Sequence, residues 1–354
     1  MAVRERWMRL SIRGLALLVL VFASGCEYDV VPLKGQEGRS LVYAAIGRAG
    51  APNAGIVVTS LGAIVIDPPL SPELGERLNL DALRRSKTFW DEKHRGTGQP
   101  SGPPPVLYVL NTTYRASHTF GNQAFKATAE IVSSTKAAKH MADLLEGRKM
   151  RELLQTEFKV PGLERHGLTG ATMSFDGAMT IHAPEVEVRL ISIGDCVGEG
   201  DAVVFLPQQK ILFAGDFVLA GFVPYHRGRT LTARAWIQQL KKFEELLPDD
   251  VVVVPGHGAQ GGKELLKQQR EFLEALLAAV KTAVLAKKTV EQAVQEVKLP
   301  NFARWQGYGE WLGENVRLVF QELTSSGGGE SGSSGGATMA APAGIEHPDS
   351  YRGL

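Results

Sequence analysis

Three side chains capable of binding a metal ion each follow an apolar stretch of the chain. His118 lies in a polar loop after residues 106–110, Asp216 ends a predicted hairpin, and His257 comes shortly after four consecutive valines. Imidazole and carboxylate groups are among the ligands that zinc prefers in proteins. The residue types therefore allow metal binding, although their positions in the sequence do not by themselves bring them together.

The loop around His118 carries the most informative pattern. Residues 111–122 read Asn-Thr-Thr-Tyr-Arg-Ala-Ser-His-Thr-Phe-Gly-Asn. This stretch resembles the metal-binding loop of the metallo-β-lactamase fold, whose pattern is N-T-H-x-H-x-D-H-x-x-G-N. His118 matches a histidine of that pattern. Thr113 and Arg115 stand where two further histidines belong, and Ser117 replaces the aspartate.

Further motifs follow in the order that this family has. Residues 194–201 resemble its G-x-x-H-T-x-G-D turn, with Val197 in the histidine position. The Ala-Gly-Asp216 segment resembles the one that carries the metal-bridging aspartate, and Pro-Gly-His257 resembles the last ligand strand. The resemblance spans residues 41–262, and the helices that follow point to the glyoxalase-II-like, periplasmic metallohydrolase branch of the superfamily.

The resemblance implies that one of the family's two metal positions is lost. The first position corresponds here to residues that are not plausible zinc donors: Thr113, Arg115 and Val197. The second position retains two histidines and one carboxylate, with Ser117 in place of a further ligand: His118, Asp216 and His257. Such a set is sufficient for one zinc or ferrous ion with open positions. The sequence therefore leaves room for one metal ion or for none.

Arg115 argues against a metal ion at this site. Its guanidinium group is always charged and has no lone pair to offer a metal. Beside Asp216 it would neutralise, through a charge-assisted pair, the carboxylate that a metal ion neutralises in the family. An Arg115 side chain turned toward solvent is the alternative.

The turn at residues 194–201 offers another alternative. A shift of one residue in the matched register would present Cys196 or Asp195 to a metal ion. We favour the interpretation of Cys196 as an ordinary loop thiol, because the glycines near both ends of the turn fix the register without a gap.

The N-terminus has the organisation of a bacterial export signal. Four arginines precede an apolar run at residues 15–22, which is too short for a stable membrane span and ends in Ala-Ser-Gly-Cys26. A cysteine directly after Ser-Gly resembles a lipobox, which predicts a signal peptide over residues 1–25 and a lipid on Cys26. A plain signal peptide with an incidental cysteine is the alternative. The first interpretation anchors the mature protein in the cell envelope, facing the periplasm or the cell exterior.

The spacing of apolar residues predicts the fold class. Short β-rich runs separated by glycine and proline, at residues 41–46, 54–59 and 63–66, favour an antiparallel meander. Asp67, at the end of the last run, matches an aspartate that braces the metal loop in the family. Two strand-rich halves, each followed by helical stretches, predict an α/β protein, an αββα sandwich of the metallo-β-lactamase type.

The chain divides into segments of different composition. We expect helices at residues 72–93 and 137–153 within the sandwich, and at 263–288, from 290 and at 305–323 after it. The predicted organisation is therefore a tether at 26–40, the metallo-β-lactamase-like domain at 41–262, a C-terminal helical extension at 263–324 and a disordered Gly/Ser-rich tail at 325–354. The 354 residues carry a net charge of +1 and no nucleic-acid motif, so we expect no nucleic-acid partner.

Two classes of function are consistent with these observations. The first is a lipoprotein that keeps the pocket of the fold, has lost the dinuclear centre, and binds a small molecule or assists another protein without hydrolysis. The second is an exported hydrolase with one zinc or iron ion at the second position. Fold does not determine function, and the sequence names neither ligand nor substrate.

The lipid anchor gives a first testable prediction. Cys26→Ser removes the thiol that would carry the lipid, so the variant should move from the membrane fraction to the soluble exported fraction. Fractionation followed by immunoblotting measures this, with Cys196→Ser as the control that should stay in the membrane fraction. Unchanged membrane association of Cys26→Ser would place the anchor elsewhere.

Overall fold

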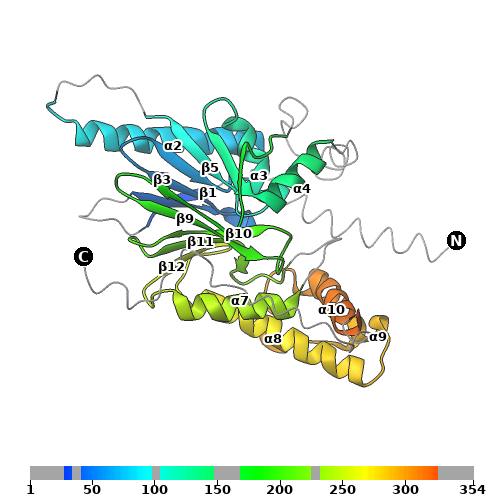
Figure 1. Cartoon of the computed structure of the whole chain (residues 1–354). Coiled ribbons are helices and arrows are strands. Elements are labelled where there is room, and N and C mark those ends of the chain that lie inside the picture. The colour runs from blue at the N-terminus through cyan, green and yellow to red at the C-terminus, as the bar shows by residue number, and fades with distance from the viewer. Residues whose placement is uncertain (1–27, 34–40, 98–103, 147–167, 225–231, 326–354) are drawn as a thin grey trace.

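The molecule is built from two β-sheets that lie face to face with helices on both outer faces. The computed structural model describes residues 28–33, 41–97, 104–146, 168–224 and 232–325. Figure 1 shows the layers in the order helix, sheet, sheet, helix. The predicted αββα sandwich is therefore confirmed. The predicted signal peptide, Cys26 and the tail from residue 326 lie outside the described residues.

The first sheet combines an antiparallel half and a parallel half. Its strands, in order across the sheet, are β1 (Tyr28–Pro32), β2 (Val42–Gly47), β3 (Ala54–Val58), β4 (Ala63–Ile66), β5 (Val106–Leu110), β6 (Glu130–Ser134) and β7 (Met173–Phe175). β2 to β4 form the predicted antiparallel meander, β1 adds a further antiparallel strand at its edge, and β4 to β7 run parallel. Every residue of β3 and β4 is buried, as expected for strands covered on both faces.

The second sheet carries two of the candidate metal ligands. Its strands, in order across the sheet, are β12 (Val252–His257), β11 (Ile211–Leu219), β10 (Asp201–Leu206), β9 (Glu187–Gly194) and β8 (Ala178–His182). β11 and β12 are parallel neighbours, and the other pairs are antiparallel. Because β11 and β12 run side by side in one direction, Asp216 and His257 come to the same end of the sheet.

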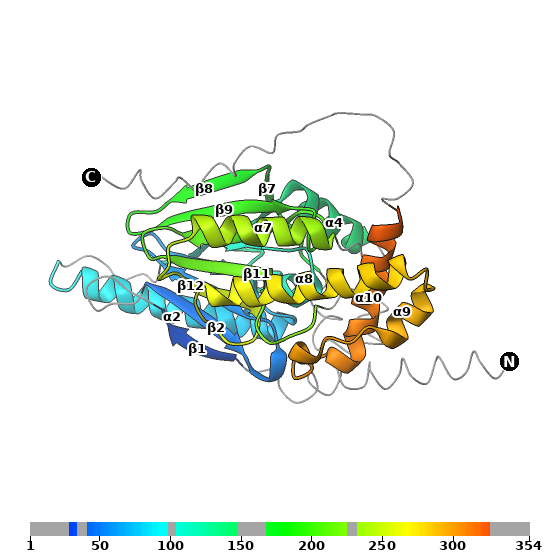
Figure 2. The ribbon, with the colours of Figure 1, turned by 90° about the horizontal axis from the view of Figure 1, so that it is seen from below.

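Helices cover the two outer faces. The first sheet is covered by α2 (Pro72–Lys93), with α3 (Ala116–Thr119), η3 (Phe120–Ala124) and α4 (Thr135–Glu146) near its end. The second sheet is covered by α7 (Ala233–Leu246) and α8 (Glu264–Leu285), beside which lie α9 (Val290–Glu296), η4 (Pro300–Phe302) and α10 (Tyr308–Ser325), as Figure 2 shows. α2 begins where the sequence predicts: Pro72 is its first residue and the Ser71 hydroxyl accepts from the Leu74 amide.

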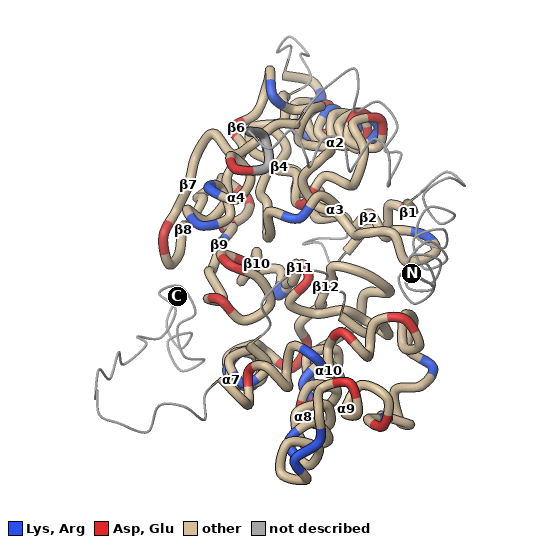
Figure 3. Tube along the Cα trace, turned by 90° about the vertical axis from the view of Figure 1, so that its right-hand side faces the viewer, with Lys and Arg blue, Asp and Glu red and all other residues tan. Residues whose placement is uncertain are grey.

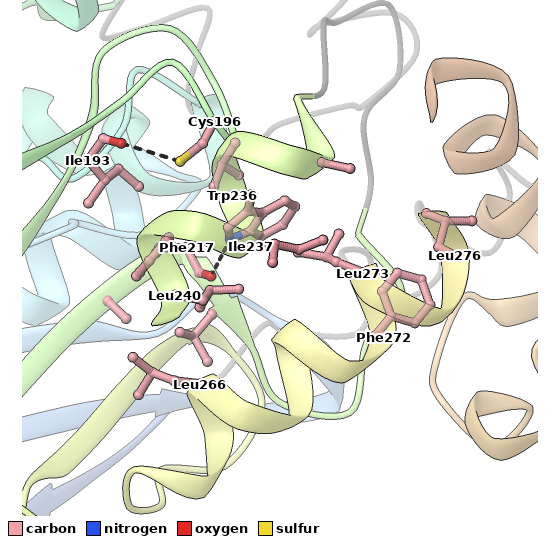
Figure 4. Packing of buried hydrophobic residues seen from close by; sticks show 14 of the residues in the cluster. Ile193, Cys196, Phe217, Trp236, Ile237, Leu240, Leu266, Phe272, Leu273 and Leu276 are labelled. Atoms are coloured by element: carbon pink, nitrogen blue, oxygen red, sulfur yellow. Dashed lines mark hydrogen bonds between the residues drawn. The ribbon is translucent and has the colours of Figure 1, made fainter. Parts of the chain in front are cut away.

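A buried apolar cluster fixes the strand that carries Asp216. Trp236 of α7 is fully buried, and its indole Nε1 donates to the carbonyl oxygen of Phe217, 3.0 Å away. Figure 4 shows this contact among the side chains that fill the space between the second sheet and α7 and α8. Phe217 follows Asp216 directly, so the packing of α7 sets the position of the carboxylate.

Charged side chains gather outside this packing. Figure 3 shows lysine, arginine, aspartate and glutamate mainly on the helices and loops, with most of the strand residues uncharged. No helix within the described ranges combines the length and apolar character needed to cross a membrane.

The predicted tether differs from the structure. Residues 28–32 form β1, which pairs along the edge of the first sheet with β2. Tyr28 is buried, and its hydroxyl donates to Asp81 of α2 at 3.0 Å. The polar composition of residues 26–40 gave no signal for this strand, because an edge strand exposes part of its side chains to solvent. An edge strand also tolerates Pro32, because the N–H that proline lacks would face away from the neighbouring strand. The fold therefore begins soon after Cys26.

The predicted helix boundaries also shift. α4 begins at Thr135 and is described to Glu146, and residues 147–153 of the predicted helix lie outside the described residues. The last helix begins at Tyr308 rather than at residue 305. Gly307, with φ +77°, breaks the backbone just before it.

A close contact between α2 and the loop of His118 gives the second prediction. A Cβ at Gly75 would lie 2.7 Å from the Cα atom of Gly121. Gly75→Ala should therefore lower the free energy of unfolding by roughly 1–3 kcal/mol, even though alanine favours helices. Gly309→Ala in α10 is the control, because its Cβ would meet nothing within 4 Å. Urea denaturation compares the two; an equal or greater stability of Gly75→Ala would contradict the contact.

Candidate metal centre

The loop after β5 delivers His118 and is closed by two asparagines. The Nδ2 atoms of Asn111 and Asn122 each donate to the Oδ1 atom of the other residue, at 3.1 and 2.9 Å. Asn111 Nδ2 also lies 3.1 Å from the carbonyl oxygen of His118. Both asparagines are buried, so these bonds hold the ends of the loop together and orient the short helix α3 that carries His118.

Asp67 ties this loop to the end of β4. Its Oδ1 atom accepts from the backbone amide of Thr112 at 2.8 Å, and its Oδ2 atom accepts from the Thr112 hydroxyl at 2.5 Å. Its Oδ2 atom also lies 3.5 Å from His118 Nδ1. Burial raises the pKa of Asp67 to about 6, against the opposing charge of His118. Asp67 thus holds both the backbone of the loop and the far side of the histidine ring.

His118, Asp216 and His257 come together at one end of the two sheets. The metal-binding atoms that they offer all lie within 4.8 Å of one another. His118 Nε2 lies 3.1 Å from Asp216 Oδ1, and His257 Nε2 lies 3.6 Å from the same oxygen. The ring of His118 is fully buried, whereas 21% of the His257 side chain is exposed. His257 therefore faces the open side of the cluster.

Arg115 meets the other oxygen of the same carboxylate. Its Nη1 atom donates to Asp216 Oδ2, and its Nη2 atom donates to the carbonyl oxygen of Val197 at 3.1 Å. Arg115 and Asp216 are 8% and 5% exposed, so the ion pair is buried. The predicted pair of Arg115 and Asp216 is present, and the alternative of a side chain turned toward solvent is wrong.

The charges in this cluster stabilise one another. Burial alone would raise the pKa of Asp216, but Arg115 and His118 outweigh it and hold that pKa well below its usual value. Burial likewise opposes protonation of His118, yet Asp216 and Asp67 raise its pKa. Burial lowers the pKa of His257. The carboxylate of Asp216 is therefore ionised, and His118 is the histidine that favours the charged form.

The other residues singled out in the sequence lie around this cluster or away from it. Thr113 and Val197 are buried, and Thr113 Oγ1 lies 3.4 Å from the amide nitrogen of Arg115. Ser117 is half-buried on α3. Cys196 lies in the apolar cluster below the second sheet, where its Sγ atom donates to the carbonyl oxygen of Ile193 at 3.4 Å and burial raises its pKa (Figure 4). The thiol is not part of the metal-binding group among the described residues. The structure therefore agrees with the interpretation of Cys196 as an ordinary thiol and not with a register shifted by one residue.

Several residues that shape the site were not assigned from the sequence. Asn111 and Asn122 stand at both ends of the matched loop pattern, and this signal was available to identify them as its closing pair. The carbonyl oxygen of Gly50 lies 2.8 Å from His257 Nδ1. The sequence gave no signal for this contact, because every residue has a backbone carbonyl and the residue type does not show which one binds. The carbonyl behind His257 is therefore visible only in the structure.

No family model matches the sequence. Solved structures that resemble the chain include the stereoselective inverting sec-alkylsulfatase Pisa1 from Pseudomonas sp., at 19% identity and a TM-score of 0.58, and a double mutant of the sec-alkyl sulfatase PisA1, at 20% identity and a TM-score of 0.59. Each of these matches covers 81% of this chain, which spans 49% of the alkylsulfatase chain.

A metallo-β-lactamase from Pontibacter korlensis is also similar, at 20% identity and a TM-score of 0.49 over 70% of this chain and 99% of that one. The two-sheet sandwich and its match to the alkylsulfatase structures show the metallo-β-lactamase fold. The resemblance first seen in the loop motifs is thereby confirmed at the level of the fold. In this metallo-β-lactamase fold, the group of His118, Asp216 and His257 can hold one metal ion.

The donor set fits a metal ion of the kind that binds two histidines and a carboxylate. The second nitrogen of each ring also has a neighbour of the type that orients metal-bound histidines: His257 Nδ1 donates to the carbonyl oxygen of Gly50, and His118 Nδ1 lies near Asp67. The opposing feature is Arg115, which already neutralises Asp216. The geometry therefore accommodates one ion on the Oδ1 side of Asp216 but presents a guanidinium group on its Oδ2 side.

The buried ion pair gives the third prediction. Arg115→Met keeps the length of the side chain but leaves Asp216 without its guanidinium partner, so the free energy of unfolding at pH 7 should fall by about 3 kcal/mol. Arg84→Met, at a side chain that is 77% exposed, should change it by less than about 0.5 kcal/mol. Urea denaturation of both variants measures the difference.

The loss of stability in Arg115→Met should also depend on pH. The pKa of Asp216 is lowered in the folded protein, so its contribution to stability is present above the ordinary aspartate pKa near 4 and is lost as the pH falls below it. Without Arg115 that pKa rises. The gap between the native protein and Arg115→Met should therefore be widest at neutral pH and shrink below about pH 4; a gap that does not vary with pH would contradict the ion pair.

Proposed function

We propose that this protein is an exported, lipid-anchored binding protein whose metallo-β-lactamase-like centre is degenerate. In this proposal the pocket binds a small molecule or supports a partner, and it does not hydrolyse its ligand. The contact of Arg115 with Asp216 carries the proposal, because a fixed cation stands on the carboxylate oxygen that would otherwise face a first metal ion.

The surroundings of the guanidinium group support the loss of that first position. Arg115 Nη2 donates to the backbone of Val197, the residue in the predicted histidine position of the turn, so the side chain spans the space between the loop and the turn. Thr113 and Val197 are buried and bring no imidazole or carboxylate to this space. Arginine has no lone pair for a metal ion. A metal ion at the first position would have to displace the buried, hydrogen-bonded guanidinium group of Arg115.

The proposed anchor agrees with the start of the fold. β1 begins at Tyr28, and a lipid on Cys26 would therefore hold the domain close to the membrane surface. In this proposal the protein belongs to the bacterial envelope and faces the periplasm or the cell exterior. Membrane contact through the lipid and an unidentified small molecule are the partners that this proposal needs.

A metal-dependent hydrolase with one ion is the second candidate. The observation in its favour is the convergence of His118, Asp216 and His257, whose donor atoms fit one zinc or iron ion. Such an ion supplies Lewis-acid chemistry when it is bound. His118, Asp216 and His257 would hold it, and Arg115 would supply a fixed positive charge nearby. Secondary alkyl sulfates are the first compounds to test, because two of the solved structures that the chain resembles are sec-alkylsulfatases.

Metal binding gives the fourth prediction and separates the two candidates. Full-length protein purified without chelator should contain no stoichiometric zinc, iron or manganese, and calorimetric titration with each ion should show no tight binding. The combined substitutions Thr113→His, Arg115→His, Val197→His and Ser117→Asp should restore binding, because the remaining ligands are in place. Tight binding of one ion by the native protein that disappears in His257→Ala would overturn the proposal and place the hydrolase first.

A further inference from the structure

The orientation of the His257 ring depends on a backbone carbonyl from the N-terminal sheet. His257 Nδ1 lies 2.8 Å from the carbonyl oxygen of Gly50. A carbonyl oxygen only accepts hydrogen bonds, so Nδ1 carries the proton. In the neutral ring the lone pair is then on Nε2, which faces Asp216 Oδ1 at 3.6 Å. Gly50 thus determines which nitrogen of His257 is available to a ligand or a metal ion.

Gly50 is in turn enclosed by two side chains from distant parts of the sequence. Its φ is +84°, and a Cβ on it would lie 2.9 Å from the ring of Phe222 and 3.0 Å from the side-chain nitrogen of Gln306. Phe222 also lies beside His257, with ring centroids 6.1 Å apart. Gly50 therefore leaves no room for a side chain beside Phe222 and Gln306, while its carbonyl oxygen meets the ring that it orients.

Phe222 is held by the C-terminal helical extension. The backbone of Gln306 accepts from the Val223 amide at 3.0 Å and donates to the carbonyl oxygen of Gly221 at 2.9 Å, so the segment before α10 pairs with residues on both sides of Phe222. The side-chain amide of Asn315, fully buried on α10, donates to the carbonyl oxygen of Pro224 at 2.7 Å. Residues 221–224 are therefore fixed from the extension rather than from the sandwich alone.

We infer that the C-terminal helical extension is part of the candidate site, where Gln306 and Asn315 act as positioning residues that hold Phe222 and Gly50 and so fix the tautomer of His257. The inference rests on the proposed function in treating His257 as a residue of the pocket. It adds a role for a segment that otherwise packs below the second sheet. In metal sites, removal of the partner that orients a histidine through its second nitrogen commonly lowers metal affinity or activity by about 10–100-fold.

The tautomer of His257 tests this inference without a metal ion or a ligand. In the full-length chain with isotope-labelled histidine, the ¹⁵N shifts of the His257 ring should report a proton on Nδ1. His257→Gln identifies these signals by their loss. Because the readout needs no bound group, its result is independent of whether the native protein binds zinc.

The first pair of variants tests the packing around Gly50. Gly50→Ala introduces a Cβ that must displace Phe222 or Gln306, so the Nδ1–H signal of His257 should be lost in favour of the Nε2–H form. Gly96→Ala is the matched control: its φ is also +84°, but a Cβ there meets nothing within 4 Å. It carries the same backbone strain and should leave the His257 signals unchanged. Retention of the Nδ1–H form in Gly50→Ala would overturn the inference.

The second pair tests the contribution of α10. Asn315→Ala removes the bond to Pro224, and should convert or broaden the Nδ1–H signal of His257. Leu312→Ala removes a buried apolar side chain from the same helix and should lower Tm while leaving His257 unchanged. Equal changes at His257 in both variants would mean that α10 acts only through general stability, and no change in Asn315→Ala would mean that the extension does not position the ring. Either result would overturn the inference.

Discussion

One buried carboxylate governs the arrangement of the site. Asp216 is 5% exposed and lies within β11, where an ionised group without partners would cost several kcal/mol. Two side chains of one loop pair with it, since Arg115 Nη1 donates to Oδ2 and His118 Nε2 lies 3.1 Å from Oδ1. Both come from the single loop after β5. The position of that loop therefore decides whether the buried carboxylate keeps both of its partners.

The fold meets this need by joining the two sheets at one end. The closing bonds between Asn111 and Asn122 and the two bonds from Thr112 to Asp67 fasten the loop to the first sheet. The Trp236 indole fastens the strand of Asp216 to the helices behind the second sheet. Neither sheet alone contains the complete site. The site therefore depends on the sandwich as a whole, and a displacement of either sheet should change the distance between the loop and Asp216.

The sandwich could be predicted from the sequence because its strands and helices have local signals: short apolar runs separated by glycine and proline, each set followed by helical stretches. The matched loop motifs likewise brought His118, Asp216 and His257 into one hypothesis, and the charge of Arg115 led to its pairing with Asp216. β1 was missed because an exposed edge strand has no strong pattern. The roles of Gly50 and Gln306 were missed for a different reason: they act through backbone groups and through contacts between residues far apart in the chain.

The two histidines are not equivalent, and this difference bears on function. His118 Nε2 lies in a 3.1 Å hydrogen bond with an ionised carboxylate, so that nitrogen carries a proton and is occupied. His257 directs its proton to the carbonyl oxygen of Gly50 and keeps the lone pair of Nε2. A metal ion would have to displace the proton of His118, whereas a ligand that donates a hydrogen bond can meet His257 as it stands. The carboxylate of Asp216 is thus paired on its buried side by Arg115 and His118, whereas Nε2 of the partly exposed His257 keeps its lone pair for a ligand.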